Sequence, residues 1–382
     1  MLNKETVQKN YEILEKFVQR HQLTHLLSDQ TPMTMTVLVT NRCVLNCKHC
    51  FNFDTVQTDE FDLNSTELTL EEYELITKKL GFFASAFFGG GEPFLRKDFA
   101  EIVDLFRRNC HTQWCSTTSN GQLQESILTQ VSKICEQDPE KRFVMNFSLD
   151  GYREQHDFIR GKGVFDRCCD TIREVNKLKQ KYSNLNVGIV TTMTTINENI
   201  LGDFFNWVAD ELAPNVISLL LVRQSPRDGE YMKQIDINNY KQAKVTLENL
   251  FAQGKNGNLN SPLGYIPMAF YEYITKTLRT GNRSFQCYAG KYGGFIDHRG
   301  NVNVCEVFDE VSENKFKIGN LRDFDYDFLK LWNSERAMQV KQNVNRADCC
   351  KHCTHETEGL LPSMYFKPNS YKERFNYIWT RM

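Results

Sequence analysis

Three closely spaced cysteines, Cys43, Cys47 and Cys50, are the residues of this chain best suited to chemistry. They follow an apolar, strand-like segment directly, and their spacing lets one iron-sulfur cluster take all three thiolates. Clusters held by protein alone normally take four cysteines, so three leave one iron free to bind and activate a small molecule. The alternative is a buried stripe on one face of a helix. Polar residues between the cysteines interrupt such a stripe, and the cluster interpretation is therefore favoured.

A second group of cysteines lies near the C-terminal end of the sequence. The segment before Cys305 is typical of a β-hairpin that turns at residues 298–300. Two cysteines separated by two other residues on a tight turn are typical of a metal or cluster site. Four thiolates would complete a second cluster, although a four-cysteine zinc site fits the same spacing. The four candidate ligands are Cys287, Cys305, Cys350 and Cys353, with Cys349 as an alternative to Cys350.

The elements that position these residues alternate between strand-like and helix-like segments from about residue 35 onwards. This alternation is typical of parallel βα units, and six of them predict an α/β fold, a partial (β/α)6 barrel. Strands are predicted over residues 35–40, 83–88, 114–118, 143–149, 187–193 and 216–222. Helices are predicted over residues 68–80, 97–108, 124–135, 165–181 and 201–212. The polar and glycine-rich clusters then follow strands, at the rim where barrel enzymes place their chemistry.

The sequence divides into five predicted regions. They are a helical N-terminal extension over residues 1–34, a partial barrel over 35–230, a helical connector over 231–286, a cysteine-containing domain with a hairpin and helix over 287–360, and a tail over 361–382.

Polar groups follow the second, third and fourth predicted strands. Glycines allow the backbone to approach a ligand closely, although a plain strand-to-helix turn with an acidic first turn has the same composition. An arginine fork is suited to a carboxylate, whereas Asn and Asp are also common in turns and caps. The candidate residues at these strand ends are Gly89, Gly90, Gly91, Glu92, Asn120, Ser148, Asp150 and Arg160.

The first cysteine motif, taken with the glycine turn one βα unit later, resembles the signature of the radical S-adenosylmethionine (radical SAM) enzymes. In that family the free iron chelates SAM, and the reduced cluster cleaves SAM to methionine and a 5′-deoxyadenosyl radical. The resemblance implies that the candidate residues at the rim bind SAM. It also implies that His49, at a position usually held by an aromatic residue, lies beside the adenine.

The second cysteine group resembles the SPASM or Twitch extension of this family, which binds auxiliary [4Fe-4S] clusters. A full SPASM domain has further cysteines, but this sequence has none after Cys353. The resemblance is therefore to the shorter Twitch type. It implies two [4Fe-4S] clusters, one that binds SAM and one auxiliary, with SAM as cosubstrate and a flavodoxin- or ferredoxin-type electron donor.

These resemblances imply a radical SAM oxidoreductase. The expected reaction is the two-electron oxidation of a small polar, sugar- or metabolite-like substrate, with the auxiliary cluster as electron acceptor. One alternative is a maturase that crosslinks or epimerises a ribosomal peptide. A second is a non-enzymatic iron-sulfur or zinc protein, which leaves the glycine turn unexplained. Arg223, Arg227 and Asp228 are candidates for binding an anionic substrate, or for solvated surface pairs.

Composition excludes several other classes of protein. The net charge is -2 and there is no long basic run, so binding dominated by nucleic-acid phosphates is not expected. No stretch has the length of a membrane span, and the polar N-terminal residues lack a signal-peptide core. Thirteen cysteines are an odd number for a disulfide framework and point to metal chemistry in a reducing compartment. We therefore expect a cytoplasmic protein.

Overall fold

The computed structural model describes most of the chain between residues 32 and 355. The described ranges are 32–51, 66–81, 84–223, 226–232, 235–257, 266–307 and 316–355. The helix predicted within residues 1–34 and the tail predicted over 361–382 lie outside these ranges, apart from residues 32–34.

Six parallel strands form the centre of the fold, in the order in which they occur along the chain. They are β1 (Thr34–Thr40), β2 (Ser85–Gly90), β3 (Trp114–Ser119), β4 (Arg142–Ser148), β5 (Leu185–Met193) and β6 (Val216–Leu221). The sheet curves but stays open, because β6 is its edge strand. This confirms the predicted partial (β/α)6 barrel.

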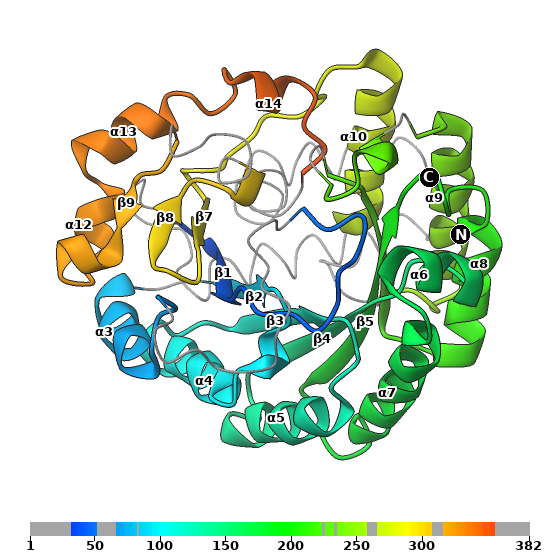
Figure 1. Ribbon diagram of the computed structural model, residues 1–382, viewed down its shortest axis with the longest axis horizontal. Coiled ribbons are helices and arrows are strands. Elements are labelled where there is room, and N and C mark those ends of the chain that lie inside the picture. The colour runs from blue at the N-terminus through cyan, green and yellow to red at the C-terminus, as the bar shows by residue number, and fades with distance from the viewer. Residues whose placement is uncertain are drawn as a thin grey trace, which may run out of the picture.

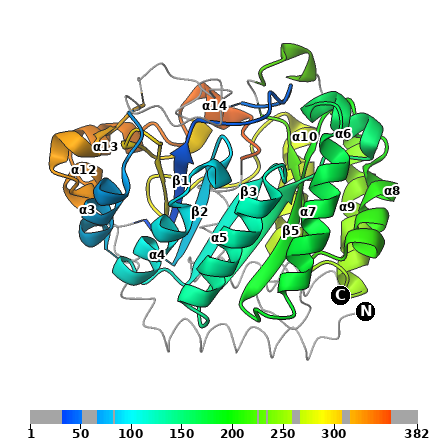
Figure 2. The ribbon, with the colours of Figure 1, turned by 60° about the horizontal axis from the view of Figure 1, so that its bottom comes forward.

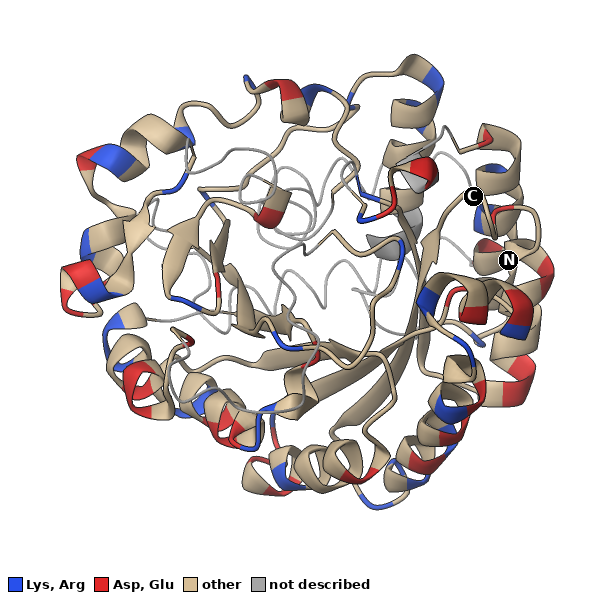
Figure 3. Cartoon of the chain, viewed as in Figure 1, with Lys and Arg blue, Asp and Glu red and all other residues tan. Residues whose placement is uncertain are grey.

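Helices cover the outside of the curved sheet (Figures 1 and 2). They are α3 (Leu70–Leu80), α4 (Phe99–Asn109), α5 (Gln124–Gln137), α7 (Val164–Leu178) and α8 (Leu201–Trp207), which continues as the π-helical turn η2 (Val208–Leu212). The short helix α6 (Arg153–Arg160) lies at the rim, and the sequence did not predict it. Figure 3 shows Lys and Arg interleaved with Asp and Glu along the outer helices.

The helix starts follow from local sequence. Thr69 precedes α3, and its hydroxyl accepts a hydrogen bond from the Glu72 backbone amide. The Thr69 backbone amide donates in return to the Glu72 carboxylate, which completes a capping box. The strand side chains that face the helices are apolar and buried, as in Phe143, Met145 and Phe147 of β4. Burial of this face against the helices holds the two layers together.

The C-terminal part of the chain extends the same sheet. Strand β7 (Gly293–Ile296) pairs in parallel with β1, and β8 (Asn301–Asn303) pairs antiparallel with β7. The predicted hairpin is confirmed: Gly300 has φ +82°, and the Asp297 carboxylate accepts hydrogen bonds from two backbone amides of the turn. The join between β7 and β1 places this hairpin beside the first cysteine loop.

The remaining elements complete the ring around the barrel. They are η1 (Pro93–Leu95), η3 (Gly229–Met232), α9 (Ile237–Ala252), α10 (Ile266–Thr280), β9 (Gly319–Asn320), η4 (Leu321–Phe324), α12 (Phe328–Trp332), α13 (Glu335–Lys341) and α14 (Asp348–Lys351). Among the described residues, no helix is both long enough and apolar enough to span a membrane. All thirteen cysteines are described, and none forms a disulfide.

Candidate functional site

The loop after β1 carries the first cysteine group. Cys43 and Cys47 are buried and Cys50 is partly exposed, and all three line one cavity inside the barrel. The Cys50 amide donates to the Cys47 carbonyl at 3.1 Å. Neighbouring segments hold this loop from both sides: the Lys48 amide donates to the Ile159 carbonyl at 2.9 Å, and the loop after β6 donates to two of its carbonyls at 2.7 and 2.8 Å.

Burial controls the acidity of these thiols. It raises the pKa of Cys43 to about 12 and that of Cys47 to about 11. Two polar side chains lie beside the sulfur atoms: Asn120 Nδ2 donates to Cys43 at 3.7 Å, and Arg160 Nη1 donates to Cys47 at 3.8 Å. A ligating cysteine is a thiolate, so metal binding must displace these protons, and Arg160 lowers that cost at Cys47.

The glycine turn after β2 packs directly on the cysteine loop. The Gly91 amide donates to the Thr40 carbonyl at 2.9 Å, and the Glu92 amide donates to the Arg42 carbonyl at 2.7 Å. A Cβ at Gly90 would lie 2.2 Å from the Thr40 oxygen, and one at Gly91 would lie 2.1 Å from the Arg42 oxygen. Only glycine therefore permits this approach of the two loops. All three glycines of the turn also line the cavity.

Glu92 does not line the cavity. Its side chain is 1% exposed and accepts hydrogen bonds from the backbone amides of Phe94 at 3.3 Å and Asn120 at 2.9 Å. Burial raises the pKa of the Glu92 carboxyl to about 7. In this structure Glu92 joins the ends of β2 and β3, and a direct contact between Glu92 and SAM stays a prediction.

Asp150 is the centre of a buried charged network after β4. Its Oδ2 atom accepts from Arg160 Nε at 2.6 Å and pairs with His49 Nε2 at 3.0 Å, while its Oδ1 atom accepts from the Thr192 amide at 2.9 Å. Burial alone would raise the pKa of Asp150, but Arg160 and His49 hold it well below its usual range. Asp150 lies behind the cavity wall, whereas Arg160 and His49 line the cavity. Asp150 therefore orients two groups that face the cavity.

Two further residues, neither among the predicted site residues, fix Asp150 in place. Asn197 Nδ2 donates to the Asp150 carbonyl at 2.8 Å, and His156 Nδ1 accepts from the Asp150 amide at 3.1 Å. Burial lowers the pKa of His156 to about 3, so its ring is neutral and acts as an acceptor. His156 therefore supports Asp150 through its backbone, and nothing in the sequence around Asn197 singled that residue out.

The cavity wall matches what SAM and an iron-sulfur cluster need. The cavity measures about 690 Å³, and its wall includes Asn120, Ser148 and Arg160 together with the first cysteine group. His49 Nδ1 is buried in this wall and has no hydrogen-bond partner in the part of the chain that the structure describes. Buried polar atoms are normally paired, so this orphan nitrogen fits a site completed by a ligand.

The second cysteine group also gathers in space. Cys287 lies within electrostatic range of Cys350 and Cys353, and Cys349 lies within range of Cys305. The Cys349 thiol hydrogen-bonds Cys350 and holds the pKa of Cys350 below its usual value. These contacts and the greater burial of Cys350 favour Cys350 as the ligand, and the choice stays a prediction. Across the described residues, no three Cys, His, Asp or Glu side chains are placed to hold a single metal ion; a cluster binds each thiolate through a different iron.

Arg322 joins the C-terminal region to the first cysteine loop. Its guanidinium binds both Glu72 carboxylate oxygens, at 2.6 and 2.9 Å, and donates to the carbonyls of Thr66 and Arg299 at 3.1 Å and of Glu67 at 3.5 Å. The buried Glu67 side chain in turn accepts from the hydroxyl of Thr40 at 2.6 Å and from the next backbone amide at 3.0 Å. A continuous set of hydrogen bonds therefore connects Arg322 of η4, through Glu67, to Thr40 at the end of β1.

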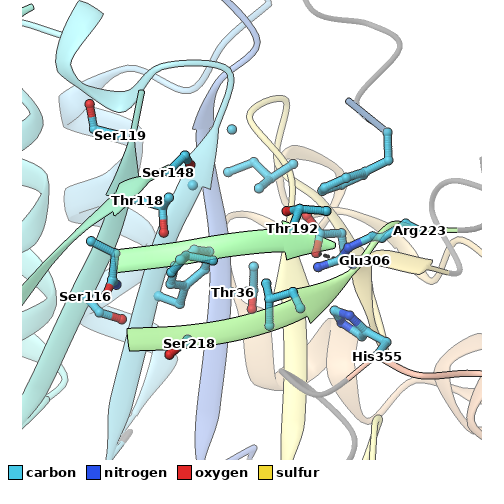
Figure 4. Close-up of a pocket in the computed structure, with 18 of the residues that line it drawn as sticks. Thr36, Ser116, Thr118, Ser119, Ser148, Thr192, Ser218, Arg223, Glu306 and His355 are labelled. Carbon is cyan, nitrogen blue, oxygen red and sulfur yellow. Dashed lines mark ion pairs between the residues drawn. The ribbon is translucent and has the colours of Figure 1, made fainter. Parts of the chain in front are cut away.

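A charged pair lies at the mouth of the cavity (Figure 4). Arg223, after β6, contacts Glu306, which follows Cys305, at 2.9 Å, and it also lies 4.4 Å from the centre of the Phe51 ring. The Arg223 and Glu306 side chains are 19% and 8% exposed. Arg223 is therefore part of a largely buried pair and not of a solvated surface pair. It connects the strand end to both cysteine regions.

Comparison with known proteins identifies the two parts of the chain. A profile of the radical SAM superfamily matches residues 37–208, and a profile of the SPASM iron-sulfur cluster-binding domain matches residues 287–354. Mycofactocin maturase MftC of Mycolicibacterium smegmatis is 24% identical over 327 residues, which are 85% of this chain and 76% of that protein. Fe-coproporphyrin III synthase of Methanosarcina barkeri is 29% identical over 205 residues, 52% of this chain; the chain spans about half of that protein, 47% of its length.

Solved structures share the fold. The structure of anSMEcpe with bound AdoMet, which is SAM, has a TM-score of 0.57 at 18% identity, over 92% of this chain and 94% of that one. Streptococcus suis SuiB bound to its precursor peptide SuiA has a TM-score of 0.56 at 16% identity, over 81% and 66% of the two chains. The radical SAM family implies a SAM-binding [4Fe-4S] cluster, and the SPASM domain implies auxiliary iron-sulfur clusters. The chain therefore carries a radical SAM domain over residues 37–208 and a C-terminal SPASM domain over residues 287–354.

Proposed function

We propose that this enzyme uses SAM-dependent radical chemistry to oxidise a peptide. The observation that carries the proposal is that one cavity is lined by both cysteine groups, with Cys43, Cys47 and Cys50 on one part of its wall and Cys353 on another. When bound, a [4Fe-4S] cluster with an open iron and SAM supplies a radical that removes a hydrogen atom from a substrate C-H bond. A substrate in this cavity would lie close to both cysteine groups.

The comparisons support a peptide more strongly than the small polar metabolite that the sequence first suggested. A maturase is similar over most of this chain, and a neighbouring fold was solved with a precursor peptide bound. The peptide maturase, the alternative interpretation of the sequence, is therefore the function that we propose. Oxidation is the proposed outcome because the four-cysteine auxiliary site leaves no iron free for substrate and is suited to accepting an electron.

The roles proposed for individual residues follow from their positions. Cys43, Cys47 and Cys50 would hold the SAM-binding cluster, and the glycine turn, Asn120, Ser148 and Arg160 would contact SAM from the cavity wall. His49 would contact the adenine. Glu92 and Asp150 would act from behind the wall by fixing the backbone of β3 and the side chains of His49 and Arg160. Cys287, Cys305, Cys350 and Cys353 would hold the auxiliary cluster.

Two further parts of the proposal concern the surroundings of the enzyme. A flavodoxin- or ferredoxin-type protein would supply the electron that starts each turnover. The cytoplasm is the proposed compartment, which is supported by thirteen cysteines without a disulfide.

The test is SAM cleavage by the anaerobically reconstituted, reduced enzyme. Formation of 5′-deoxyadenosine should rise on addition of short peptides encoded beside the gene, and should not rise with sugar phosphates or aminosugars. Cys43→Ala should abolish it, whereas Cys110→Ala, which removes a buried thiol packed between β3 and the outer helices, should retain it. If only the small metabolites stimulated SAM cleavage, the substrate would be a small metabolite and not a peptide. If no mixture produced 5′-deoxyadenosine, the whole proposal would be contradicted.

A further inference from the structure

Residues with a hydroxyl group line the cavity from all six parallel strands. Alternate residues of a strand point to opposite faces of the sheet, and here the cavity-facing positions are often Ser or Thr. Figure 4 shows these side chains around the cavity. They are Thr36 of β1, Ser116, Thr118 and Ser119 of β3, Ser148 of β4, Thr192 of β5 and Ser218 of β6, and Thr34 of β1 and Ser85 of β2 line the same cavity.

These cavity-facing hydroxyls differ from the hydroxyls on the opposite face of the same strands. The Thr117 hydroxyl donates to the Phe88 carbonyl at 2.9 Å, and the Thr191 hydroxyl donates to the Leu149 carbonyl at 2.7 Å. The Thr34 hydroxyl donates to the Tyr292 carbonyl at 3.3 Å, and the Ser119 hydroxyl accepts from the Gly121 amide at 3.0 Å. Within the described ranges, the other strand hydroxyls on the cavity wall form no hydrogen bond with the protein. Thr36 is only 1% exposed and still has no partner for its hydroxyl among these residues. Hydroxyls that line a cavity without a protein partner are free to pair with a ligand that has its own donors and acceptors.

Three of these residues lie deep in the barrel. Thr36 is four residues before the end of β1, and Ser116 and Ser218 are each three residues before the ends of β3 and β6. At a rise of about 3.3 Å per residue, they lie roughly 10–13 Å below the strand ends that carry the cysteine loop and the Arg160 network. They therefore form a set separate from Ser148 and Thr192 at the rim.

The deep part of the cavity is uncharged. Around the deep hydroxyls the wall is formed by side chains such as Phe87, Val144 and Val216. The acidic, basic and histidine side chains on the wall, by contrast, come from segments outside the strands, and are His49, Arg160, Arg223, Glu306 and His355. A charged group inserted to this depth would lose its hydration without gaining a counter-ion.

From this arrangement we infer that Thr36, Ser116 and Ser218 form a recognition site for an uncharged side chain that carries a hydroxyl or a carboxamide. The apolar wall accommodates the carbon atoms of that side chain, and the hydroxyls pair its polar end. The inference rests on the proposed function in one respect: the side chain belongs to a peptide. This site then determines which residue of the peptide binds with its side chain deep inside the barrel.

Binding of capped amino acids tests the inference without turnover. The probes are N-acetyl methylamides in two matched pairs, glutamine with methionine and tyrosine with phenylalanine, together with the glutamate derivative. Their affinities for the reconstituted, unreduced enzyme are measured by saturation-transfer NMR, with and without SAM. At least one polar member should bind roughly tenfold more tightly than its apolar partner, because it gains one or two hydrogen bonds. The glutamate derivative should bind more weakly than the glutamine derivative.

Variants assign the preference to the deep hydroxyls. The double variant Ser116→Ala with Ser218→Ala should lose the preference for the polar member while retaining the weak binding of the apolar one. Ser183→Ala, at an exposed outer turn, should leave both unchanged. Equal binding within both pairs, no polar binding, displacement of the probe by SAM, or a preference retained in the double variant would each overturn the inference.

The outcome is separable from that of the proposed function. If peptides stimulate SAM cleavage but the probes show no preference, the deep hydroxyls do not recognise the substrate and the peptide proposal stands. If the probes show the preference but no peptide stimulates cleavage, the recognition site stands and its ligand is a free, uncharged polar molecule.

Discussion

Replacing Arg322 with Ala should loosen the connection between the SPASM region and the first cysteine loop. The substitution removes the paired contact with the Glu72 carboxylate and the hydrogen bonds to three backbone carbonyls, including that of Glu67. Glu67 holds the end of β1 through the Thr40 hydroxyl. The segment around residues 66–72 should therefore open more often in the variant.

The size of the effect follows from exposure. Hydrogen bonds with a charged partner contribute about 1.5–3 kcal/mol when buried, whereas exposed ion pairs contribute about 0–1 kcal/mol. The Arg322 side chain is 34% exposed and that of Glu72 is 14% exposed, so solvent screens part of the interaction. We expect about 2 kcal/mol for the whole set, which corresponds to roughly 30-fold more frequent local opening.

Hydrogen exchange of the Leu68 amide measures this opening, because that amide donates to the His298 carbonyl at 2.7 Å across the same contact. Arg322→Ala should speed its exchange by roughly 30-fold. The matched control is Arg173→Ala, which removes one pair with Asp170 between side chains 47% and 66% exposed and should leave Leu68 unchanged. A rate for Arg322→Ala within about twofold of the wild type would refute the reasoning.

Three further predictions test the site by substitution. Gly91→Ala should prevent cluster assembly or folding, because its Cβ would lie 2.1 Å from a carbonyl oxygen of the cysteine loop, whereas Gly229→Ala, with open space around it, should keep the wild-type iron content and thermal midpoint. Burial lowers the pKa of His156 to about 3 in the folded protein, whereas it is about 6.5 in the unfolded chain. The free energy of unfolding should therefore decrease as the pH falls below 6.5, by about 1.4 kcal/mol at pH 5.5. Thermal unfolding of His156→Gln should lack this part of the pH dependence. In a measurement of iron content, Cys350→Ala should lose the iron of one cluster and Cys349→Ala should retain it. The opposite pattern would show that Cys349, and not Cys350, is the ligand. Zinc in the wild-type enzyme would show that the second cysteine group binds zinc and not an iron-sulfur cluster.

The strands and most helices were predictable because their signals are local. The alternation of apolar strands and helical segments placed six strands to within a few residues. Helix α6 was missed because it is short and polar and follows a strand end with no separate start signal. The pairing of β7 with β1 joins segments more than 250 residues apart, and no local pattern in either segment indicates it.

The candidate site was predictable in position but not in orientation. Residues after parallel strands share one rim, so the cysteines, the glycine turn and Arg160 were expected to converge. Whether a side chain faces the cavity or lies behind its wall depends on packing, and Glu92 and Asp150 lie behind it. The hydroxyls in the depth of the barrel did leave a signal. Thr36, Ser116 and Ser218 occupy strands that would be apolar on both faces if the barrel interior were filled with side chains.

The most direct test of the central claim is the intact mass of a candidate peptide after incubation with reduced enzyme and SAM. A peptide lighter by the mass of two hydrogen atoms, formed together with 5′-deoxyadenosine and not by Cys43→Ala, is the predicted result. A peptide of unchanged mass that gains one deuterium in D2O would contradict oxidation and indicate epimerisation. A peptide unchanged in both respects, while a small polar metabolite becomes lighter by two hydrogen atoms, would contradict the claim that the substrate is a peptide.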